Sequence, residues 1–594
     1  MEYSRTLYPR PQFERSEWIN LNGKWTCHIQ RKAPFEKYRH DSRENIDSKG
    51  FEMEINVPFA PETKASGLEV NELIKTIYYH RILNIPKAYE GKKILLHFEA
   101  VFYHAEIYID GSFVDFHDGG SSSFSVDITK FVQAGGDFNL VVKAESDLAS
   151  GNIPSGKQSS FIQSYACFYH RTTGIWQSVW MEAVSNYALA SVKCIWNSNN
   201  SELIFNPEYY HIKEGNTLTI EIEDGSGNVG STFKCIQGEP ISLKIDNPHL
   251  WSNLDPHLYS IKYNVKDKEG DIIDSVSSYM GLRTINIEDG FVYLNGKKIY
   301  QRLVLDQGFY PDGNWTAPTE KDLERDIILS KAAGFNGARL HQKVFEQRFF
   351  YYADKYGYFV WAESPSWGLD YNNEGLPARN FITEWSEIIK RDINHPSIIA
   401  WTPLNETYLF VNQQAHRRLH RDVYNICKLI DPTRPVNDAS GYIHFITDLW
   451  TVHTYEQEPN SLSEKLKATG KDIFRCFPNE EVEYDGQPYL VDEFGGIKWD
   501  VETQDNTNLS ESQNLESWGY GRAPRTINEF YSRLEGLVEA ILDKEHICGY
   551  CYTQLTDVEQ EKNGIYLYNR QTKFDMQIIR SIFSNNPEGY EEYT

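Results

Sequence analysis

The segment EKDLERDIILSKAAGFNGARL (320–340) places a helical stretch directly before a short apolar run, and this succession decides the fold of the second half of the chain. Similar stretches and runs follow it, among them YFVWAE (358–363), IIAWTPL (398–404), YLVDEF (489–494) and RLEGLVEAILDK (533–544). Alternation of strands and helices over about 300 residues is typical of a parallel (β/α)8 barrel. We therefore expect a TIM barrel over residues 286–594.

The chain before residue 286 has a different pattern. Short alternating segments such as KKILLHFEA (92–100), HAEIYID (104–110) and FNLVVKAE (138–145) have Gly, Asp or Ser at their boundaries, and a second set occupies residues 188–280. Strands of this length with turn residues between them indicate β-sandwiches. The segment SGNIPSGKQ (150–158) is expected to be a loop. We place the break between the two sandwiches near residue 184, which gives domains over 1–184 and 185–285.

Composition limits the function classes. A chain of 594 residues exceeds what one hydrophobic core usually supports, in agreement with several domains. The net charge of −25 argues against nucleic-acid binding. No apolar run follows a basic start, and no stretch of about 18 apolar residues occurs, so neither a signal peptide nor a membrane span is expected. Eight scattered cysteines fit reduced thiols, and we expect a cytoplasmic location.

Two of the apolar runs lead into a carboxylate, at Asn405-Glu406 and at Asp492-Glu493. Catalytic groups of a TIM barrel lie at the C-terminal ends of its strands. Glycoside hydrolysis needs two such carboxyl groups, one to protonate the leaving oxygen and one to attack the anomeric carbon or activate water. Glu406 and Glu493 are 87 positions apart, roughly three βα units of ~30 residues each. The two side chains are therefore expected on strands four and seven, facing each other across the barrel mouth.

Around these residues the chain resembles glycoside hydrolase family 2, which contains β-galactosidases, β-glucuronidases and β-mannosidases. The acid/base signature of the family is similar to residues 394–398 (NHPSI) with Trp401 and Asn405-Glu406, and its nucleophile motif is similar to residues 492–496 (DEFGG). Further similar segments are 21–25 (LNGKW), 174–177 (GIWQ), 250–251 (LW) and 281–283 (GLR). The resemblance implies an N-terminal jelly roll, a central immunoglobulin-like β-sandwich and a C-terminal barrel.

The resemblance also implies roles for residues of the site. Glu493 would be the nucleophile, and Glu406 the general acid and then the base, which calls for a raised pKa. Asn405 would hydrogen-bond the sugar 2-hydroxyl. Arg339 matches an arginine beside the nucleophile, with a surface ion pair as the alternative. Tyr455 would hydrogen-bond the nucleophile, with a packed structural role equally open.

Other expected sugar contacts each have an alternative interpretation. Trp367 and Trp499 would wall the binding site, and core packing is the alternative for each. Lys343 stands where relatives have an aromatic residue near the sugar. Its ammonium either meets a sugar carboxylate, or reaches solvent while its stem packs, or pairs with Asp306, in which case the substrate is neutral.

Departures from the family limit the choice of sugar. Glu561 and Asn563 stand where the glucuronidase branch has the Asn and Lys that hold a uronate. We therefore expect an exo-acting retaining β-glycosidase that releases a galacto-configured sugar, from a β-galactoside or a β-galacturonide. The alternatives are a β-glucuronidase or another member of different preference and, from another class, a non-catalytic carbohydrate-binding protein.

The expected ligand is a small-molecule or oligosaccharide substrate. No cofactor and no metal are expected, because the retaining mechanism requires neither. Neither nucleic acid nor membrane is an expected partner, and the oligomeric state stays open, a homo-oligomer being one alternative.

Overall fold

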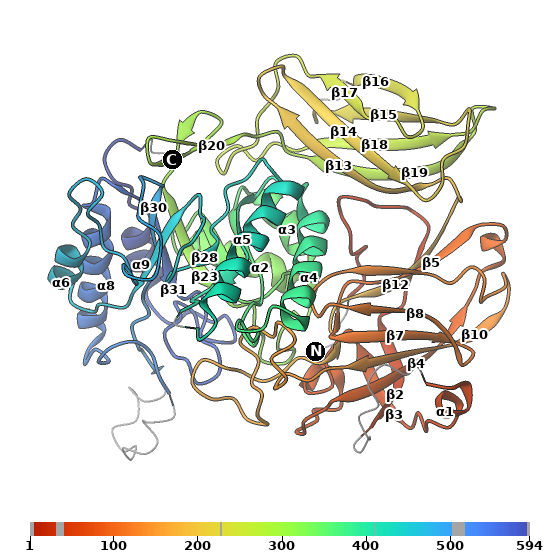
Figure 1. The fold of residues 1–594 in the computed structure, drawn as a ribbon, viewed down its shortest axis with the longest axis horizontal. Helices are drawn as coiled ribbons and strands as arrows, with labels where there is room; N and C mark the ends of the chain where they lie inside the picture. The colour runs from red at the N-terminus through yellow and green to blue at the C-terminus, as the bar shows by residue number, and fades with distance from the viewer. Residues whose placement is uncertain (1–4, 31–40, 226–228, 409, 502–516, 591–594) are drawn as a thin grey trace.

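The computed structural model describes residues 5–30, 41–225, 229–408, 410–501 and 517–590. Figure 1 shows two β domains, coloured red to orange and yellow, beside a third domain of alternating strands and helices in green to blue. The three fold classes expected from the sequence are present in that order along the chain. Among the described residues, no helix has both the length and the apolar character needed to cross a membrane.

The first domain is a jelly-roll-like sandwich of two antiparallel sheets. One sheet contains, in spatial order, β1 (Trp18–Asn20), β12 (Val179–Val184), β5 (Lys93–Phe98) and β9 (Phe124–Asp127). The other contains β3 (Met53–Val57), β2 (Gly23–Ile29), β4 (Thr76–Asn84), β10 (Asp137–Glu145), β7 (His104–Ile109) and β8 (Ser112–Asp118). A short helix, α1 (Arg43–Asp47), lies beside the second sheet. Apolar side chains from both sheets, such as Leu96 and Val142, form one buried core between them.

The second domain is also a sandwich of two antiparallel sheets. They are β13 (Leu189–Asn197), β14 (Glu202–Tyr209) and β17 (Ile241–Lys244), and β16 (Val229–Ile236), β15 (Thr217–Glu223), β18 (Tyr259–Lys266) and β19 (Ile272–Met280). Along β13 and β14 buried positions such as Cys194 and Phe205 alternate with more exposed ones, because one face of each sheet covers the core. A three-stranded ribbon, β20 (Ile285–Glu288), β21 (Phe291–Leu294) and β22 (Lys297–Lys298), then leads into the third domain.

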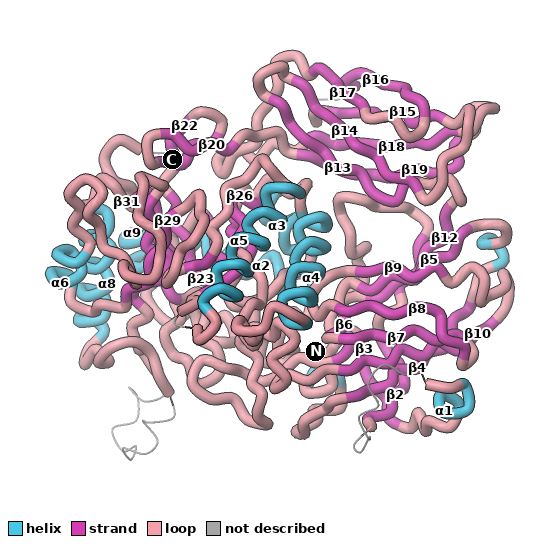
Figure 2. The backbone as a smooth tube through the Cα atoms, in the orientation of Figure 1, coloured by secondary structure: helices cyan, strands magenta, loops and turns pink. Residues whose placement is uncertain are grey.

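The third domain contains a parallel barrel (Figure 2). Seven strands form one continuous parallel sheet, in the order β26 (Ile398–Thr402), β25 (Phe359–Glu363), β24 (Gly337–Leu340), β23 (Gln301–Asp306), β31 (Ile547–Thr553), β30 (Tyr489–Gly495) and β29 (Trp450–Thr454). Residues 436–440 span the gap between β26 and β29. Val436 bridges Trp401 in parallel, and β28 (Ala439–Ser440) pairs with β27 (Leu404–Asn405).

Helices cover the outside of this barrel. They are α2 (Glu320–Ala332), α3 (Gln347–Tyr356), α4 (Leu376–Asp392), α5 (Gln413–Ile430), α6 (Pro459–Lys465), α8 (Ile527–Leu542) and α9 (Met576–Phe583). The sequence of α2 explains its start, because Thr319 and Asp322 form a capping box. Leu323 and Ile327, four residues apart, turn one face of α2 into the core. Strands such as β26 are buried along their whole length, as expected for a parallel sheet covered by helices.

Residues 146–173 form a loop of the first domain, between β10 and β11 (Gly174–Ile175). This loop makes hydrogen bonds with the barrel domain. Ser155 N–H donates to the carbonyl of Trp367 (2.8 Å), and Gly156 N–H donates to the carbonyl of Pro365 (3.0 Å). Gly156 has φ +57°, and a Cβ at this position would lie 2.3 Å from the carbonyl oxygen of Gln342. Only glycine fits this close approach of two backbones.

Candidate active site

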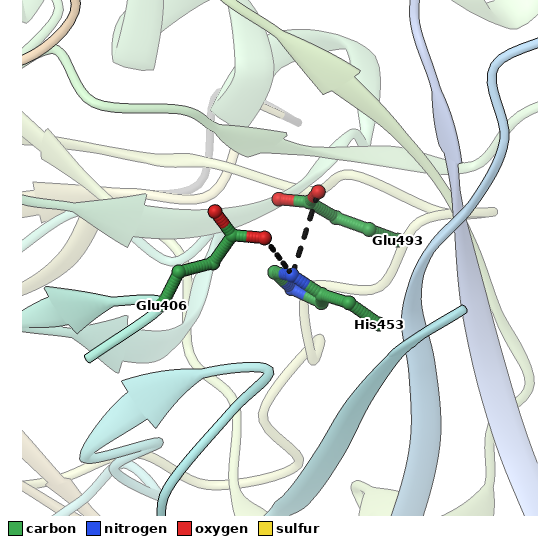
Figure 3. A group of neighbouring side chains, drawn as sticks. All are labelled: Glu406, His453 and Glu493. Carbon is green, nitrogen blue, oxygen red and sulfur yellow. Dashed lines mark hydrogen bonds and ion pairs between the residues drawn. The ribbon is translucent and has the colours of Figure 1, made fainter. Parts of the chain in front are cut away.

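Two carboxylates meet at the barrel mouth. Glu406 directly follows β27, and Glu493 lies on β30. Three atoms lie within 4.8 Å of one another: one carboxylate oxygen of Glu406, one of Glu493, and a ring nitrogen of His453 (Figure 3). Retaining glycosidases hold their two carboxyl groups about 5–5.5 Å apart, whereas inverting enzymes leave about 6.5–9.5 Å for a water molecule. The separation here therefore favours direct attack by one carboxylate.

Glu493 is buried and its two oxygens are held by different donors. Arg339, at the end of β24, donates to Oε1, and the Tyr455 hydroxyl donates to Oε2. The Arg339 guanidinium is fully buried and also donates to Oε2 of Glu363 (2.6 Å). Hydrogen bonds of this kind stabilise an ionised carboxylate. The structure thus places Arg339 and Tyr455 beside Glu493, instead of at the surface or in the packed core.

His453, on β29, lies between the acidic side chains of the site. Its Nδ1 is 2.8 Å from Oε1 of Glu406 and 3.5 Å from Oε2 of Glu493, and its Nε2 is 3.3 Å from Oδ1 of Asp492. Burial lowers the pKa of His453, but the charges of Glu493 and Asp492 outweigh burial and raise this pKa to about 10. His453 is therefore an imidazolium at neutral pH, and Nδ1–H donates to Glu406.

This contact changes the expectation for the acid/base residue. Burial raises the pKa of Glu406, but the hydrogen bond and charge of His453 outweigh it, so the pKa lies below its usual value in the ligand-free site. The sequence led us to expect a raised pKa, because it did not reveal His453 as a neighbour. In the contact between the two side chains, His453 is therefore the donor and Glu406 the acceptor.

Glu406 also has an unusual backbone. Its φ is +46°, in the left-handed region that side chains other than glycine rarely adopt. Such a conformation costs about 1–3 kcal/mol and persists where the surroundings fix it, often at functional sites. Here the Glu406 N–H donates to the carbonyl of Ser440 (2.9 Å), which joins the residue to β28.

Asn405 offers an unused donor in the same place. Its Oδ1 accepts from Arg339 (3.3 Å), and its backbone carbonyl accepts from the indole N–H of Trp367 (3.2 Å). Its Nδ2 is buried and has no hydrogen-bond partner among the described residues. Buried polar groups are nearly always paired, so this amide is suited to donate to a bound hydroxyl group.

The two expected tryptophans have different surroundings. Trp367 is half-buried, and its indole hydrogen bond fixes it beside Asn405, as a wall residue requires. Trp499 instead packs against Phe530 (ring centroids 5.9 Å apart) and Phe574 (6.4 Å) in the barrel core. The expectation that Trp499 walls the site is therefore corrected. Trp499 follows the DEFGG motif closely, but the sequence does not show the direction of its side chain, which points toward α8.

Lys343 does not face the catalytic carboxylates. Its buried ammonium donates to the carbonyls of Gly308 and Trp315, both at 2.6 Å, and lies 4.5 Å from the centroid of the Phe345 ring. The hypothesis that Lys343 meets a sugar carboxylate is thus contradicted, as is the alternative of an ammonium in solvent. The position of Lys343 in the motif did not predict this orientation, because a residue beyond the end of β24 can direct its side chain away from the barrel mouth.

Asp306, expected at the sugar site or as the partner of Lys343, is buried near it. One of its oxygens accepts from the N–H of Gly308 (2.9 Å). Burial raises the pKa of Asp306 to about 7 and lowers the pKa of Lys343 to about 7, and each charge opposes the effect of burial on the other. The two groups interact electrostatically, but the hydrogen bonds of Lys343 go to backbone carbonyls.

Several residues of the site were not among those expected from the sequence. Glu363 ends β25, so it carries the same strand-end signal that identified Glu406 and Glu493. His453 stands two residues before Tyr455, on a strand that reads as ordinary apolar sequence. Lys157, whose pKa is raised by the charges of both catalytic carboxylates among others, gave no signal because its loop belongs to another domain. Burial raises the pKa of Glu363 to about 7 despite the charge of Arg339.

Glu406, His453 and Glu493 form the single group of three potential metal ligands in the described part of the chain. Their ligand atoms are already engaged. His453 Nδ1 donates to Glu406, and Glu493 accepts from Arg339 and Tyr455. A cation here would have to displace these donors, so the arrangement suits proton transfer better than metal binding.

Comparison with protein families finds three models along the chain. "Glycosyl hydrolases family 2, sugar binding domain" matches residues 45–183, "Glycosyl hydrolases family 2" matches 186–283, and "Glycosyl hydrolases family 2, TIM barrel domain" matches 285–496. The last match contains both Glu406 and Glu493.

Among curated proteins, the chain is similar to a beta-glucuronidase of Paenibacillus borealis, with 21% identity over 97% of this chain and 98% of that one. It is also similar to a beta-galactosidase of Thermoanaerobacter pseudethanolicus, with 25% identity over 78% of this chain and 60% of the other. The chain spans 40% and 60% of the length of two of the curated relatives that it matches, and 98% of a third.

Among solved structures, the fold is similar to a beta-D-glucuronidase of Dictyoglomus thermophilum, with a TM-score of 0.77, 19% identity, and coverage of 99% of this chain and 100% of that one. A GH2 beta-galacturonidase of Eisenbergiella tayi gives a TM-score of 0.73 with 19% identity over 99% of both chains. At these identities the two structures support the fold of the chain.

Proposed function

The chain belongs to glycoside hydrolase family 2, since models of all three of its domains match in order, and from this premise we propose that it is an exo-acting retaining β-glycosidase. The observation that carries the proposal is the pair Glu406 and Glu493, with carboxylate oxygens within 4.8 Å. This geometry supports double displacement, in which one carboxylate attacks while the other supplies a proton.

In the first step Glu493 attacks the anomeric carbon and forms a covalent ester, while the bond to the leaving oxygen breaks. Arg339 and Tyr455 hold the attacking carboxylate in place. The imidazolium of His453 passes its Nδ1 proton to Glu406 through their 2.8 Å contact, and Glu406 gives this proton to the leaving oxygen. In the second step Glu406 removes a proton from water, whose oxygen attacks the anomeric carbon and releases Glu493.

The sugar is best proposed as a β-uronide. The relatives with full-length similarity are named as glucuronidases or a galacturonidase, so a β-glucuronide is at least as well supported as the galacto-configured sugar expected from the sequence. A β-galactoside remains the second candidate, because a β-galactosidase is among the relatives and Glu561 and Asn563 replace the expected uronate clamp.

A panel of nitrophenyl β-glycosides tests the proposal. We expect hydrolysis of the β-glucuronide or β-galacturonide with a kcat/KM above that of the corresponding glucoside and galactoside. The double variant Glu406→Gln/Glu493→Gln, which changes charge but little volume, is the matched control and should be inactive. Binding of sugars without turnover of any of these glycosides would favour the non-catalytic carbohydrate-binding protein.

A further inference from the structure

Lys157 lies in the 146–173 loop of the first domain, yet its surroundings belong to the barrel. The loop is fixed on both sides of the residue. Gly156 N–H donates to the carbonyl of Pro365, and the Lys157 carbonyl accepts from the N–H of Tyr169 (2.8 Å). Only 8% of Lys157 is exposed. The backbone therefore holds this lysine against the barrel mouth.

The ammonium of Lys157 has no hydrogen-bond or ion-pair partner within the described ranges of the chain, and lies 5.5 Å from the centroid of the Trp367 ring. Burial lowers its pKa, but the charges of Glu561, Glu493 and Glu406 outweigh burial and raise it. An ammonium has three hydrogen-bond donors, which water or the acceptors of a ligand can engage. The group is suited to an acceptor that arrives with a ligand.

The other cations near the carboxylates are already engaged. Arg339 donates to Glu493 and Glu363, and His453 donates to Glu406. In the described part of the site, Lys157 is thus a charged group whose ammonium makes neither a hydrogen bond nor an ion pair with these carboxylates.

The carboxylate with the largest electrostatic effect on Lys157, Glu561, is also occupied. The two oxygens of Glu561 accept from the Tyr169 hydroxyl and from Nδ2 of Asn563 (2.9 Å). Burial raises the pKa of Glu561, and the charge of Lys157 opposes this effect. Glu561 thus does not take the hydrogen bonds of Lys157, although it stands in the position of the expected clamp.

We propose that Lys157 binds the carboxylate of an acidic sugar held between Glu406 and Glu493, so that a residue of the first domain determines specificity for uronides. This inference rests on the proposed function. The half-buried ring of Trp367 lies beside the same ammonium and can pack against an apolar face of that sugar. A charge-assisted hydrogen bond of this kind corresponds to about ten- to a hundredfold in affinity.

The first test compares Lys157→Met with the unaltered protein. We expect kcat/KM for nitrophenyl β-glucuronide and β-galacturonide to fall about ten- to a hundredfold, mainly through KM, with at most a small change for the β-glucoside and β-galactoside. Lys157→Arg should keep part of the uronide preference. Equal losses on acidic and neutral substrates would show a merely structural role and overturn the inference.

Lys343→Met is the matched control, because it removes another buried lysine, whose ammonium donates to two backbone carbonyls of the barrel domain. It should leave the ratio of uronide to neutral kcat/KM unchanged, whatever its effect on stability. A collapse of this ratio in Lys343→Met but not in Lys157→Met would reverse the assignment.

A binding measurement separates this inference from the proposed function. Calorimetry should show that the unaltered protein binds D-glucuronate or D-galacturonate more tightly than the neutral sugar of the same configuration, and that Lys157→Met loses this difference. No preference for the acid sugar would overturn the role of Lys157, even if glycosides are hydrolysed. A preference lost in Lys157→Met, without hydrolysis of any glycoside, would contradict the proposed function alone.

Discussion

The site has two parts of different origin. Its floor consists of side chains at the ends of barrel strands, among them Arg339, Glu406 and Glu493, and its wall includes the 146–173 loop of the first domain with Lys157. Arg339 donates hydrogen bonds to other floor residues, Glu493 and Asn405. The ammonium of Lys157 has no hydrogen bond of this kind among the described residues. In our proposal, the barrel supplies the chemistry and the junction between the domains supplies the choice of sugar.

The largest expected effect comes from removing the proposed nucleophile of the floor, Glu493. Glu493→Ala should lower kcat roughly 10⁴- to 10⁶-fold, as expected when a hydrolase loses the group that forms its covalent intermediate. Azide should restore part of the activity and give a glycosyl azide of inverted configuration. Steady-state kinetics and product analysis check both statements, and activity that azide does not restore would argue against Glu493 as nucleophile.

Removing the acid/base should have a smaller effect that depends on the leaving group. For Glu406→Ala we expect a loss of about 10²–10⁴-fold on alkyl glycosides, because general acid catalysis contributes this much. Dinitrophenyl glycosides need little proton donation and should lose far less in their first step. A loss of the same size for every leaving group would remove Glu406 from this role.

His453 should affect the pH dependence more than the maximal rate. We expect His453→Asn to lower kcat/KM about ten- to a hundredfold and to move the alkaline limb of its pH profile to lower pH. In the unaltered protein the proton shared with Glu406 is lost only near the pKa of His453, about 10, whereas Glu406 alone would lose it earlier. An unchanged alkaline limb would contradict the shared proton.

The same residue gives a stability test. The pKa of His453 rises from 6.5 to about 10 on folding, so its contribution to stability is complete below about pH 6.5 and is lost as the pH rises through 10. Thermal unfolding between pH 7 and 10 should therefore show a steeper loss of stability for the unaltered protein than for His453→Asn. Parallel curves would indicate that His453 is not charged in the folded state.

The smallest expected effect comes from a change in the backbone of the wall. Gly156→Ala would place a Cβ 2.3 Å from the Gln342 carbonyl, whereas Gly151→Ala, also at positive φ, would meet Asp370 at 3.3 Å. Because both glycines share the cost of positive φ and both face the barrel domain, the contrast isolates the clash with the Gln342 carbonyl. We expect Gly156→Ala to raise KM for uronides several-fold more than Gly151→Ala, at about 1–3 kcal/mol of added strain. Equal KM values would separate the loop from substrate binding.

The sequence predicted the floor because its information is local. Asn405-Glu406 and Asp492-Glu493 each follow an apolar run, and a parallel barrel brings such strand ends together. Arg339 and Tyr455, each expected beside the nucleophile with an alternative left open, donate to Glu493. Glu363 carried the same signal and could have been found in the same way.

The wall was not predictable in this way, because it depends on contacts between distant segments. Lys157 and Trp367 are 210 positions apart, and only the docking of the first domain brings them together. Lys343 was named from its place in a motif, but its side chain turns toward the carbonyls of Gly308 and Trp315. Spacing along a chain fixes the strand that carries a residue, whereas the direction of a side chain beyond the strand depends on its packing.

The stereochemistry of the first product tests the central claim most directly. A nitrophenyl β-glycoside that the protein hydrolyses is followed by ¹H NMR from the first minutes, before the free sugar mutarotates. The short separation of Glu406 and Glu493 predicts that the β-anomer appears first and the α-anomer later. Initial release of the α-anomer would show that water attacks directly, and would contradict the assignment of Glu493 as the nucleophile.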